Sequence, residues 1–566
     1  MCAVTRAGGR VILPDVKNDP LFRRIKDGVG DTGPATGSLP NRFKAEIPDS
    51  FDPGECREAI LKTWRGITDQ VWRRFIDGPV ALRGCGTDGI WNRQIDGFWD
   101  IAWVTGANPG DGKDLSWLDR RKNWRTHRPP VEGGDHCMLM GDWQELSGFI
   151  RARERNAQDE FWDALKARTD TGNRLNLEKN ERLCAIALVK RLFPEVAKTA
   201  LGWEPSWNGE TVRWPSTPRL AAAEWLRYAW KEARAEATAF IAECGSRLPE
   251  PELEAGNKLS QVSGALLHRN GIESAHSDEL PGSAANAKTT RQKLRDAHKA
   301  LVEIVGEPSA FYTLLLMDGD HVGRLLRENQ IKVAHALSEF SAGVDEIIRQ
   351  RGGHTVYAGG DDVLALLPIE GAITAAIETR KAYRSAFASN GLTNATISAA
   401  IVFAHFHAPL RGVLREAHRQ LDNIAKKCNG RDSLALCVLT QGGMNRAWVS
   451  CFETAGLFPP GKLLEGARTI EAHLSGRFLY AIQTRYEEIL GDLGEKDAKR
   501  ILRAEYEHSG GTGSASADDT EKLIDNLYFI AVHHPGPDHA DMNSAKGPSM
   551  EGPLIARFLA REGLWI

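Results

Sequence analysis

The sequence predicts an α+β protein with its strands gathered in one region and helices through most of the rest. Between residues 311 and 439, apolar runs of strand type alternate with stretches of helical periodicity. Their order begins β-α-β-β-α-β, which is the ferredoxin-like pattern with helices on one face of an antiparallel sheet. Outside this region, long segments such as 219–247 are rich in Ala, Glu and Arg and favour helix.

The elements of this region are bounded by changes of periodicity and by turn residues. The expected elements are strand 311–317, helix 332–350, hairpin 354–367, helix 371–389, strand 395–404, helix 409–427 and strand 433–439. A helical pattern also begins at Val322 and resumes at Ile331 after a short break. Residues 455–566 are expected to be mostly helical, with Ser509–Ala517 as a flexible linker.

The residues before 311 predict fewer strands. A short strand is expected at Arg10–Leu13 and an amphipathic helix at Cys56–Ile76. The aromatic residues from Trp91 to Val104 predict a strand region, with the tryptophans in a core rather than in a base-stacking platform. Further helices are expected at 176–197 and 289–304.

Composition narrows the class of protein. The chain has 566 residues, a length that predicts several domains, and its 42% hydrophobic content is enough for real cores. A net charge of −3 gives no global basic footprint for nucleic acid, although it is compatible with a local groove. No run reaches the roughly 20 apolar residues of a membrane span. The nine cysteines form no Cys-x-x-Cys pair, which favours reduced thiols and a cytoplasmic location.

The hairpin carries the strongest chemical signal, Gly359-Gly360-Asp361-Asp362. Two adjacent aspartates repel each other, so holding both ionised favours a divalent cation between them. The glycines leave room for a large group, such as a triphosphate, close to the backbone. The alternative is a solvated turn, because Gly and Asp are ordinary turn residues.

A second acidic stretch strengthens the metal interpretation. The first strand of the region ends in Asp318-Gly319-Asp320. If this strand pairs with the hairpin, three or four carboxylates converge at one edge of a sheet. That arrangement holds two Mg²⁺ ions for phosphoryl or nucleotidyl transfer.

These residues resemble a known family. Asp318-Gly319-Asp320 before a helix, and the hairpin from Tyr357 to Pro368, look like the palm domain shared by nucleotide cyclases and template-dependent polymerases. Within that superfamily, the chain resembles the large subunit of type III CRISPR effector complexes, in the Cmr (III-B) branch. The other matching stretches are Leu39–Phe43, Gln94-Ile95 with Phe98-Trp99, Leu183–Arg191 and Ala425–Asp432.

The resemblance implies a domain plan and a function. It implies a partial first palm-like domain at 1–115, a helical domain with a degenerate cysteine site at 116–305, a second palm at 306–453 and a helical domain at 454–566. Members of the family act in antiviral defence with crRNA, target RNA and other Cmr-type subunits. When target RNA binds, they make cyclic oligoadenylate from ATP, which implies a nucleotidyltransferase with two Mg²⁺ or Mn²⁺ ions.

The resemblance also implies roles for single residues. Asp318 and Asp362 would ligate metal with the Gly319 carbonyl, and Asp361 would ligate the second ion or help deprotonate the attacking hydroxyl. The expected nucleotide-binding residues are Gly359, Gly360, Asp320, Lys426 and Arg431. Lys426 and Arg431 would neutralise phosphate charge. The alternative for Lys426 is a solvated helix end.

The chain departs from the family in three places. It contains no His-Asp dipeptide, so HD-type nuclease activity is not expected. Its start lacks the opening strand and helix of a first palm, so that domain is expected to be incomplete. Where relatives carry Cys-x-x-Cys, this chain has Cys137 and Met140, so zinc is doubtful even with His136 and His127 nearby. A further cluster, His533 to His539, is expected to be a solvated loop.

Two other functions stay open from the sequence. The first is a diguanylate cyclase. After the second acid, the signature of these enzymes has Glu or Asp followed by Phe, whereas Val363 follows Asp362 here. The second is a non-catalytic scaffold that organises crRNA, target and partner subunits. The incomplete first palm and the altered cysteine site favour the scaffold, and the intact acidic set opposes it.

Overall fold

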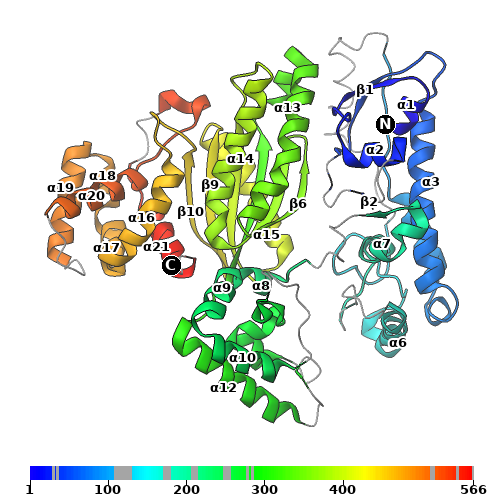
Figure 1. Ribbon diagram of the computed structural model, residues 1–566, viewed down its shortest axis with the longest axis horizontal. Coiled ribbons are helices and arrows are strands. Elements are labelled where there is room, and N and C mark those ends of the chain that lie inside the picture. Colours follow the sequence, from blue (N-terminus) through cyan, green and yellow to red (C-terminus); the bar gives the residue numbers. More distant parts are fainter. Residues whose placement is uncertain are drawn as a thin grey trace. The chain divides into compact units, whose positions relative to one another are not determined.

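The computed structural model describes residues 1–28, 32–33, 37, 39–106, 131–169, 177, 180–205, 214–245, 256–275, 280–281, 286–509, 517–542 and 547–563 (Figure 1). The chain divides into two compact units, Met1–Ala35 with Asn41–Val212, and Thr36–Pro40 with Arg213–Ile566. The boundary near residue 212 falls inside the helical domain expected at 116–305. Within the described ranges, no helix is both long and apolar enough to cross a membrane.

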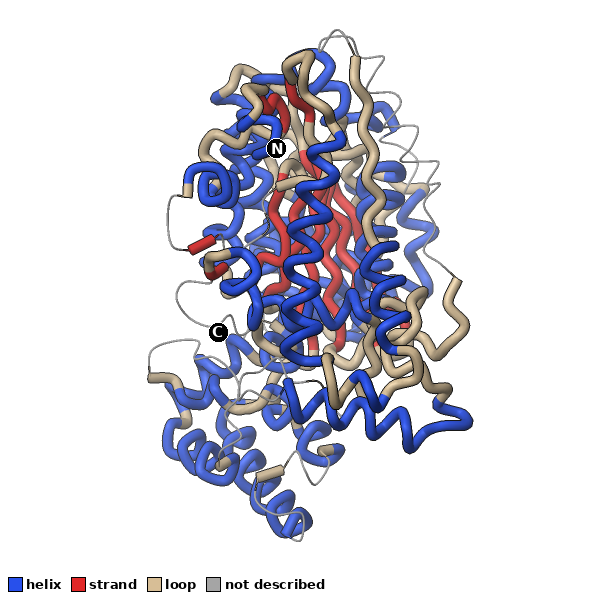
Figure 2. The backbone as a smooth tube through the Cα atoms, turned by 90° about the vertical axis from the view of Figure 1, so that its right-hand side faces the viewer, coloured by secondary structure: helices blue, strands red, loops and turns tan. Residues whose placement is uncertain are grey.

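The second unit is built on a six-stranded sheet of order β10-β9-β8-β5-β7-β6. The strands are β5 (Phe311–Gly319), β6 (His354–Gly359), β7 (Asp362–Leu367), β8 (Ile397–His405), β9 (Ser433–Thr440) and β10 (Gly443–Cys451). Figure 2 shows these strands side by side with helices next to them. β8 and β9 are parallel, and the other neighbours are antiparallel. The predicted order of strands and helices along the chain is confirmed from β5 to β9, and β10 is an additional edge strand.

Helices cover both faces of this sheet, so the expectation of helices on one face is wrong. α13 (Val322–Gln350) and α14 (Ile369–Ser389), which Figure 1 shows alongside the sheet, share a core with the β5 side chains Leu315 and Met317. α15 (Leu410–Arg419), the π-helix η6 (Gln420–Cys428) and α8 (Thr217–Ala221) pack against Leu314 and Leu316 on the other side. The reason is visible along β5, where successive apolar residues from both sides of the strand are buried.

The break expected in the helix after β5 is confirmed. Asn329 interrupts α13 with non-helical angles, φ −152° and ψ 66°. The helix then continues to Gln350 and buries Val333, Leu337 and Phe340 against the sheet.

Two helical regions flank the sheet within the second unit. Before it lie α8, α9 (Ala223–Glu232), α10 (Arg234–Cys244), α11 (Arg269–Ser274) and α12 (Ala287–Val305), and α9 to α12 share a core of their own. After it lie α16 (Pro459–His473), α17 (Gly476–Ala481), α18 (Glu487–Gly491), α19 (Glu495–Ser509), α20 (Ala517–Ala531) and α21 (Glu551–Glu562). The mostly helical C-terminal part is therefore confirmed, while residues 510–516 of the expected linker lie outside the described residues.

The first unit is mainly helical. Its helices are α1 (Cys2–Arg6), α2 (Pro20–Asp27), α3 (Gly54–Val71) continued by η1 (Trp72–Ile76), α4 (Thr87–Gly97), α6 (Arg151–Thr169) and α7 (Ala185–Leu201). β1 (Arg10–Leu13) pairs with β3 (Lys44–Glu46), and β2 (Thr32–Gly33) with β4 (Glu204–Pro205). The described residues of this unit thus contain two-stranded pairs and not a complete palm sheet.

Two sequence-based expectations for this unit are corrected. The aromatic stretch starting at Trp91 begins in helix α4, not in a strand, because Trp91 and Ile95 lie one helical turn apart and enter the same core. The helix expected at 176–197 is α7, which begins only at Ala185, after Cys184 accepts a hydrogen bond at its N-cap.

Candidate active site

Asp318 is positioned by strand register. β5 pairs with β7 in antiparallel fashion, with Met317 opposite Val363. One step further along this register, Asp318 comes beside Asp362, the first residue of β7. The pairing on which the sequence prediction depended is therefore present, and acids from distant parts of the sequence meet at one edge of the sheet.

The hairpin turn presents Asp361 next to them. Gly359 pairs with Asp362, so Gly360 and Asp361 form the turn. Gly360 has a φ of 66°, in the left-handed region that glycine adopts without steric cost. A Cβ built on Gly360 meets no atom within 4 Å, so the turn is open on that side.

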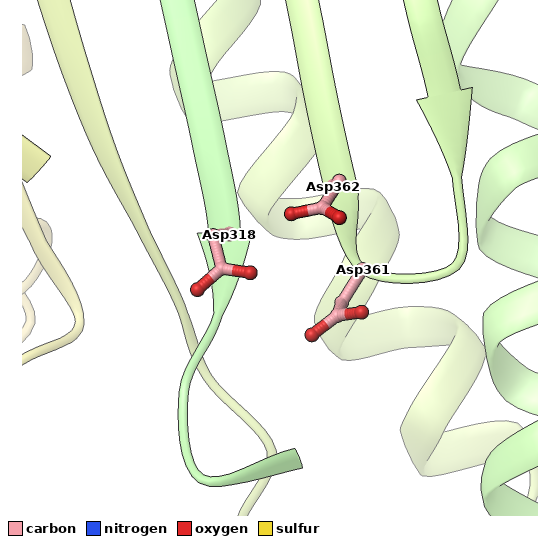
Figure 3. A group of neighbouring side chains, drawn as sticks. All are labelled: Asp318, Asp361 and Asp362. Carbon is pink, nitrogen blue, oxygen red and sulfur yellow. The ribbon is translucent and has the colours of Figure 1, made fainter. Parts of the chain in front are cut away.

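The carboxylates of Asp318, Asp361 and Asp362 form a compact group (Figure 3). One oxygen of each lies within 4.8 Å of the others, and the three side chains extend into the space between β5 and the hairpin. In the described part of the chain, no other set of three His, Cys, Asp or Glu side chains has this spacing. Carboxylate oxygens are the ligands that Mg²⁺ and Mn²⁺ prefer, so these residues fit such an ion.

The charges of this group are balanced only in part. Partial burial raises the pKa of Asp362 to about 7, and the hydrogen bond with Asp318 and the charge of Asp361 act in the same direction. Lys426 on η6 supplies a positive charge, since its Nζ bonds to the Asp318 carboxylate and lies 3.1 Å from the Gly319 carbonyl oxygen. Its side chain is only 12% exposed, so the alternative of a solvated helix end is wrong.

Asp320 lies behind this group and not in it. Asp320 is only 2% exposed, and burial raises the pKa of its carboxyl. The carboxylate accepts hydrogen bonds from Ser398 Oγ at 2.8 Å, Thr396 Oγ1 at 2.9 Å and the Asp432 amide at 3.0 Å. These bonds tie the end of β5 to the start of β8 and to the loop before β9.

A buried ion pair continues this network. Arg380 on α14 donates from Nε and Nη2 to the two carboxylate oxygens of Asp432, at 2.7 and 2.6 Å. The Arg380 side chain is 3% exposed and also bonds to Glu453. No sequence pattern identifies Arg380 as buried, because an arginine in a helix is ordinarily solvated.

Arg431 lies at the edge of a basic cavity. The cavity, of about 520 Å³, is lined by His418, Arg419, Asp422, Asn423, Lys426, Lys427 and Arg431. Because Lys426 also reaches Asp318, the cavity adjoins the acidic group. The two residues predicted to meet phosphate, Lys426 and Arg431, are thus brought to one side of the site.

The loop with the His533–His539 cluster contacts this region and is partly buried, so the expectation of a solvated loop is only partly correct. Asp538 accepts hydrogen bonds from Arg431 Nη1 at 2.7 Å and His321 Nε2 at 3.0 Å. His321 directly follows Asp320 in the sequence. Sequence reasoning missed the Asp538 contacts, because nothing in a histidine-rich loop identifies its distant partners.

The residues considered for zinc do not come together as a full set. His127 lies outside the described residues, and His136 contacts the Gly141 carbonyl oxygen. Cys137 accepts a hydrogen bond from Cys184, which lowers the pKa of Cys137 to about 6. Among the described residues, no third side chain completes a metal set around these cysteines.

The fold and the acidic group define a class, the palm domain with a nucleotidyltransferase-like fold. Residues 311–435 match the family model described as Cas10/Cmr2, second palm domain. The chain is 25% identical to the CRISPR system Cmr subunit Cmr2 of Pyrococcus furiosus, over 83% of this chain and 60% of the relative. The chain therefore carries a Cas10/Cmr2-type palm and spans about three fifths of that relative, which confirms the resemblance inferred from the sequence.

Solved structures share the fold. The type III-B Cmr-beta complex in the apo state contains a chain similar to this one, with a TM-score of 0.57 and 13% identity, over 92% of this chain and 70% of that chain. A chain of the Cmr-beta complex bound to cognate target RNA gives a TM-score of 0.61 and 12% identity, over 97% of this chain and 77% of that chain. At these identities, the likeness is one of fold.

Proposed function

We propose that this chain is the large subunit of a type III-B CRISPR effector complex and that its palm makes cyclic oligoadenylate from ATP when target RNA is bound. The observation that carries the proposal is the convergence of Asp318, Asp361 and Asp362 within 4.8 Å, beside Lys426. The Cas10/Cmr2-type palm and the similarity to Cmr2 support the same assignment.

The chain's own residues have distinct tasks in this proposal. Asp318, Asp361 and Asp362 would hold Mg²⁺ or Mn²⁺, and such ions neutralise phosphate charge and activate a hydroxyl for attack. The open turn at Gly360 leaves space for the triphosphate. Lys426 and Arg431 neutralise its phosphates from the side of the basic cavity.

The proposed partners are other Cmr-type subunits, crRNA and target RNA. They are inferred from the similarity to Cmr2 and to chains of two Cmr-beta structures, in one of which the complex is bound to cognate target RNA. We also propose that residues 1–115 belong to a first palm-like domain, that residues 116–305 form a helical domain, and that the protein acts in the cytoplasm.

The test uses the assembled complex with ATP, Mg²⁺ and target RNA. The Asp361→Ala/Asp362→Ala variant is compared with Asp518→Ala, which removes an exposed carboxylate paired with Lys522 on α20. Product is expected from the wild type and from Asp518→Ala, and a loss of at least about 100-fold in the double variant. Equal product from all three proteins would refute the assignment.

A non-catalytic scaffold is the second candidate. It is favoured by the ion pair between Lys426 and Asp318, because a carboxylate already neutralised by lysine has less need of a metal ion. Titration of the isolated chain with ATP and Mn²⁺ separates the two functions. Metal-dependent ATP binding that is lost with Asp361 and Asp362 supports the enzyme, and its absence supports the scaffold.

A further inference from the structure

A carboxylate from the C-terminal helical region lies beside the predicted active site. Asp538 belongs to a short helical turn, η8 (Pro537–Met542), that follows α20. Its Oδ2 bonds to both Arg431 Nη1 and His321 Nε2. The two donors come from different elements, since His321 precedes α13 and Arg431 precedes β9. A single oxygen therefore bridges two nitrogen donors at the edge of the palm.

The loop that carries Asp538 is docked through its backbone. The Gly536 amide donates to the Asn429 carbonyl at 2.6 Å, and the Asp538 amide to the Gly430 carbonyl at 3.0 Å. Gly536 has no room for a side chain, because a Cβ would lie 1.9 Å from the Arg431 carbonyl oxygen. Asp538 is thus placed by a fitted contact and not by chance proximity of a surface side chain.

The backbone that carries the two donors is constrained. His321 and Arg431 have φ angles of 56° and 66°, and Asp432 has 41°, in the left-handed region that such residues rarely adopt. Asp432 is held there by Arg380 and by Asp320. The network around Asp432 therefore constrains the backbone next to Arg431.

One of the two donors, Arg431, also faces the region where phosphates are expected. Arg431 lines the basic cavity with Lys426, and Lys426 bonds to Asp318. His321 lies three positions after Asp318 in the chain. Phosphate in the basic cavity would therefore meet Arg431, and His321 lies beside Arg431 through their shared partner Asp538.

The Asp538 carboxyl is held in its ionised form, so Asp538 can occupy an anion-binding site. Burial alone would raise the pKa of its carboxyl, but the hydrogen bonds from His321 and Arg431 outweigh that effect and hold the pKa below its ordinary value. The three side chains remain 30–37% exposed, so the contact is accessible to a ligand in solution.

We propose that Arg431 and His321 form a subsite for the distal phosphates of a nucleoside triphosphate, and that Asp538 occupies it until nucleotide binds. The inference rests on the proposed function for the identity of the ligand. In this arrangement Asp538 competes with phosphate, so the C-terminal helical region lowers nucleotide affinity at the site. Release of Asp538 is then a point at which a partner or bound target can raise that affinity.

The test measures binding of inorganic tripolyphosphate to the full chain without divalent metal, so that it depends neither on the acidic group nor on turnover. The variants are Asp538→Asn, Arg431→Ala and the two combined. Asp525→Asn is the matched control, because Asp525 is an aspartate of the same helical region paired with a lysine, Lys499. ATP with Mg²⁺ serves as the second probe.

Asp538→Asn is expected to tighten tripolyphosphate binding about fivefold, in line with loss of one competing exposed ion pair. Arg431→Ala should weaken binding, and the combined variant should show no gain. Equal affinity of Asp538→Asn, Asp525→Asn and wild type overturns the subsite. The subsite is also overturned if Asp538→Asn still tightens tripolyphosphate binding in the Arg431→Ala background. It is overturned as well if no variant binds tripolyphosphate. Failure of cyclase activity alongside the expected gain would refute the proposed function and leave the subsite standing.

Discussion

The Nζ of Lys426 bonds to the Asp318 carboxylate and lies 3.1 Å from the carbonyl oxygen of the next residue, Gly319. A lysine in this place neutralises a residue predicted to ligate metal. It therefore competes with the ion when nucleotide is absent and is available to phosphate when nucleotide is present.

Lys426→Met separates these two effects. Without nucleotide, the variant should bind Mn²⁺ several-fold more tightly, because Asp318 loses a competing cation. With ATP, product formation should fall about 100-fold, because a charge that stabilises the phosphates is lost. Lys462→Met is the control, since Lys462 forms an exposed pair with Glu465. A variant with normal turnover would remove Lys426 from the proposed mechanism.

Gly319 is predicted to tolerate no side chain. A Cβ there would lie 2.8 Å from the Asp361 Cβ, 2.8 Å from the Tyr383 hydroxyl and 2.5 Å from the Val322 Cγ2. Gly319→Ala should therefore displace Asp361 and reduce Mn²⁺ affinity at least about tenfold, measured by titration calorimetry.

The matched control for Gly319 lies four residues later in the chain. A Cβ on Gly323 meets one atom, Arg327 Nη1 at 4.0 Å. Gly323→Ala should preserve Mn²⁺ affinity and raise the free energy of unfolding by up to about 1 kcal/mol, because alanine is the better helix former. Similar metal affinities of the two alanine variants would contradict the close packing at Gly319.

Asp320 is predicted to hold structure and not metal. Asparagine offers one acceptor oxygen where the carboxylate now accepts from Ser398, Thr396 and Asp432, so Asp320→Asn should cost about 1–3 kcal/mol of unfolding free energy. Below its unfolding temperature it should bind Mn²⁺ nearly as the wild type does. Asp318→Asn should show the reverse, with weaker metal binding and little loss of stability. An Asp320→Asn protein of wild-type stability that no longer binds Mn²⁺ would make Asp320 a ligand.

The contrast between Asp318 and Asp320 shows what the sequence can predict. The apolar run before Asp318 and the two runs around Gly359-Gly360 were enough to predict paired strands with acids at one edge, and the register confirms this. Alternation along a strand would put residues 318 and 320 on the same side. β5 ends at Gly319, however, so the chain turns and Asp320 enters the interior. The point at which a strand ends depends on its packing neighbours as well as on its own residues.

Contacts between distant segments of the chain could not be predicted from the sequence either. Asp538 meets Arg431 and His321 only because the C-terminal helices fold back onto the palm, and no local pattern encodes that return. The prediction of a strand at Trp91 was wrong for a different reason. Its short apolar repeat suits either a strand or a helix, and packing in the first unit selects the helix.

Acid should destabilise the helical region before the palm sheet. His268 is 6% exposed and bonds to the Pro218 carbonyl oxygen at 3.0 Å, and burial lowers its pKa to about 4. The unfolded chain takes up this proton near pH 6.5, whereas the folded chain stays neutral until about pH 4. The contribution of His268 to the free energy of unfolding is therefore fully present above about pH 6.5. It is lost as the pH falls toward 4, and about 2 kcal/mol of it is lost at pH 5.

His268→Gln tests this origin, because glutamine keeps a donor for the Pro218 carbonyl and does not titrate. Its unfolding midpoint in urea should fall less between pH 7.5 and 5 than that of the wild type. Some dependence should remain, since burial also lowers the pKa of His298, which bonds to the Leu267 carbonyl. His508→Gln, on the exposed side of α19, should leave the wild-type dependence unchanged. If His268→Gln has the same pH dependence as the wild type, the acid sensitivity arises elsewhere in the chain.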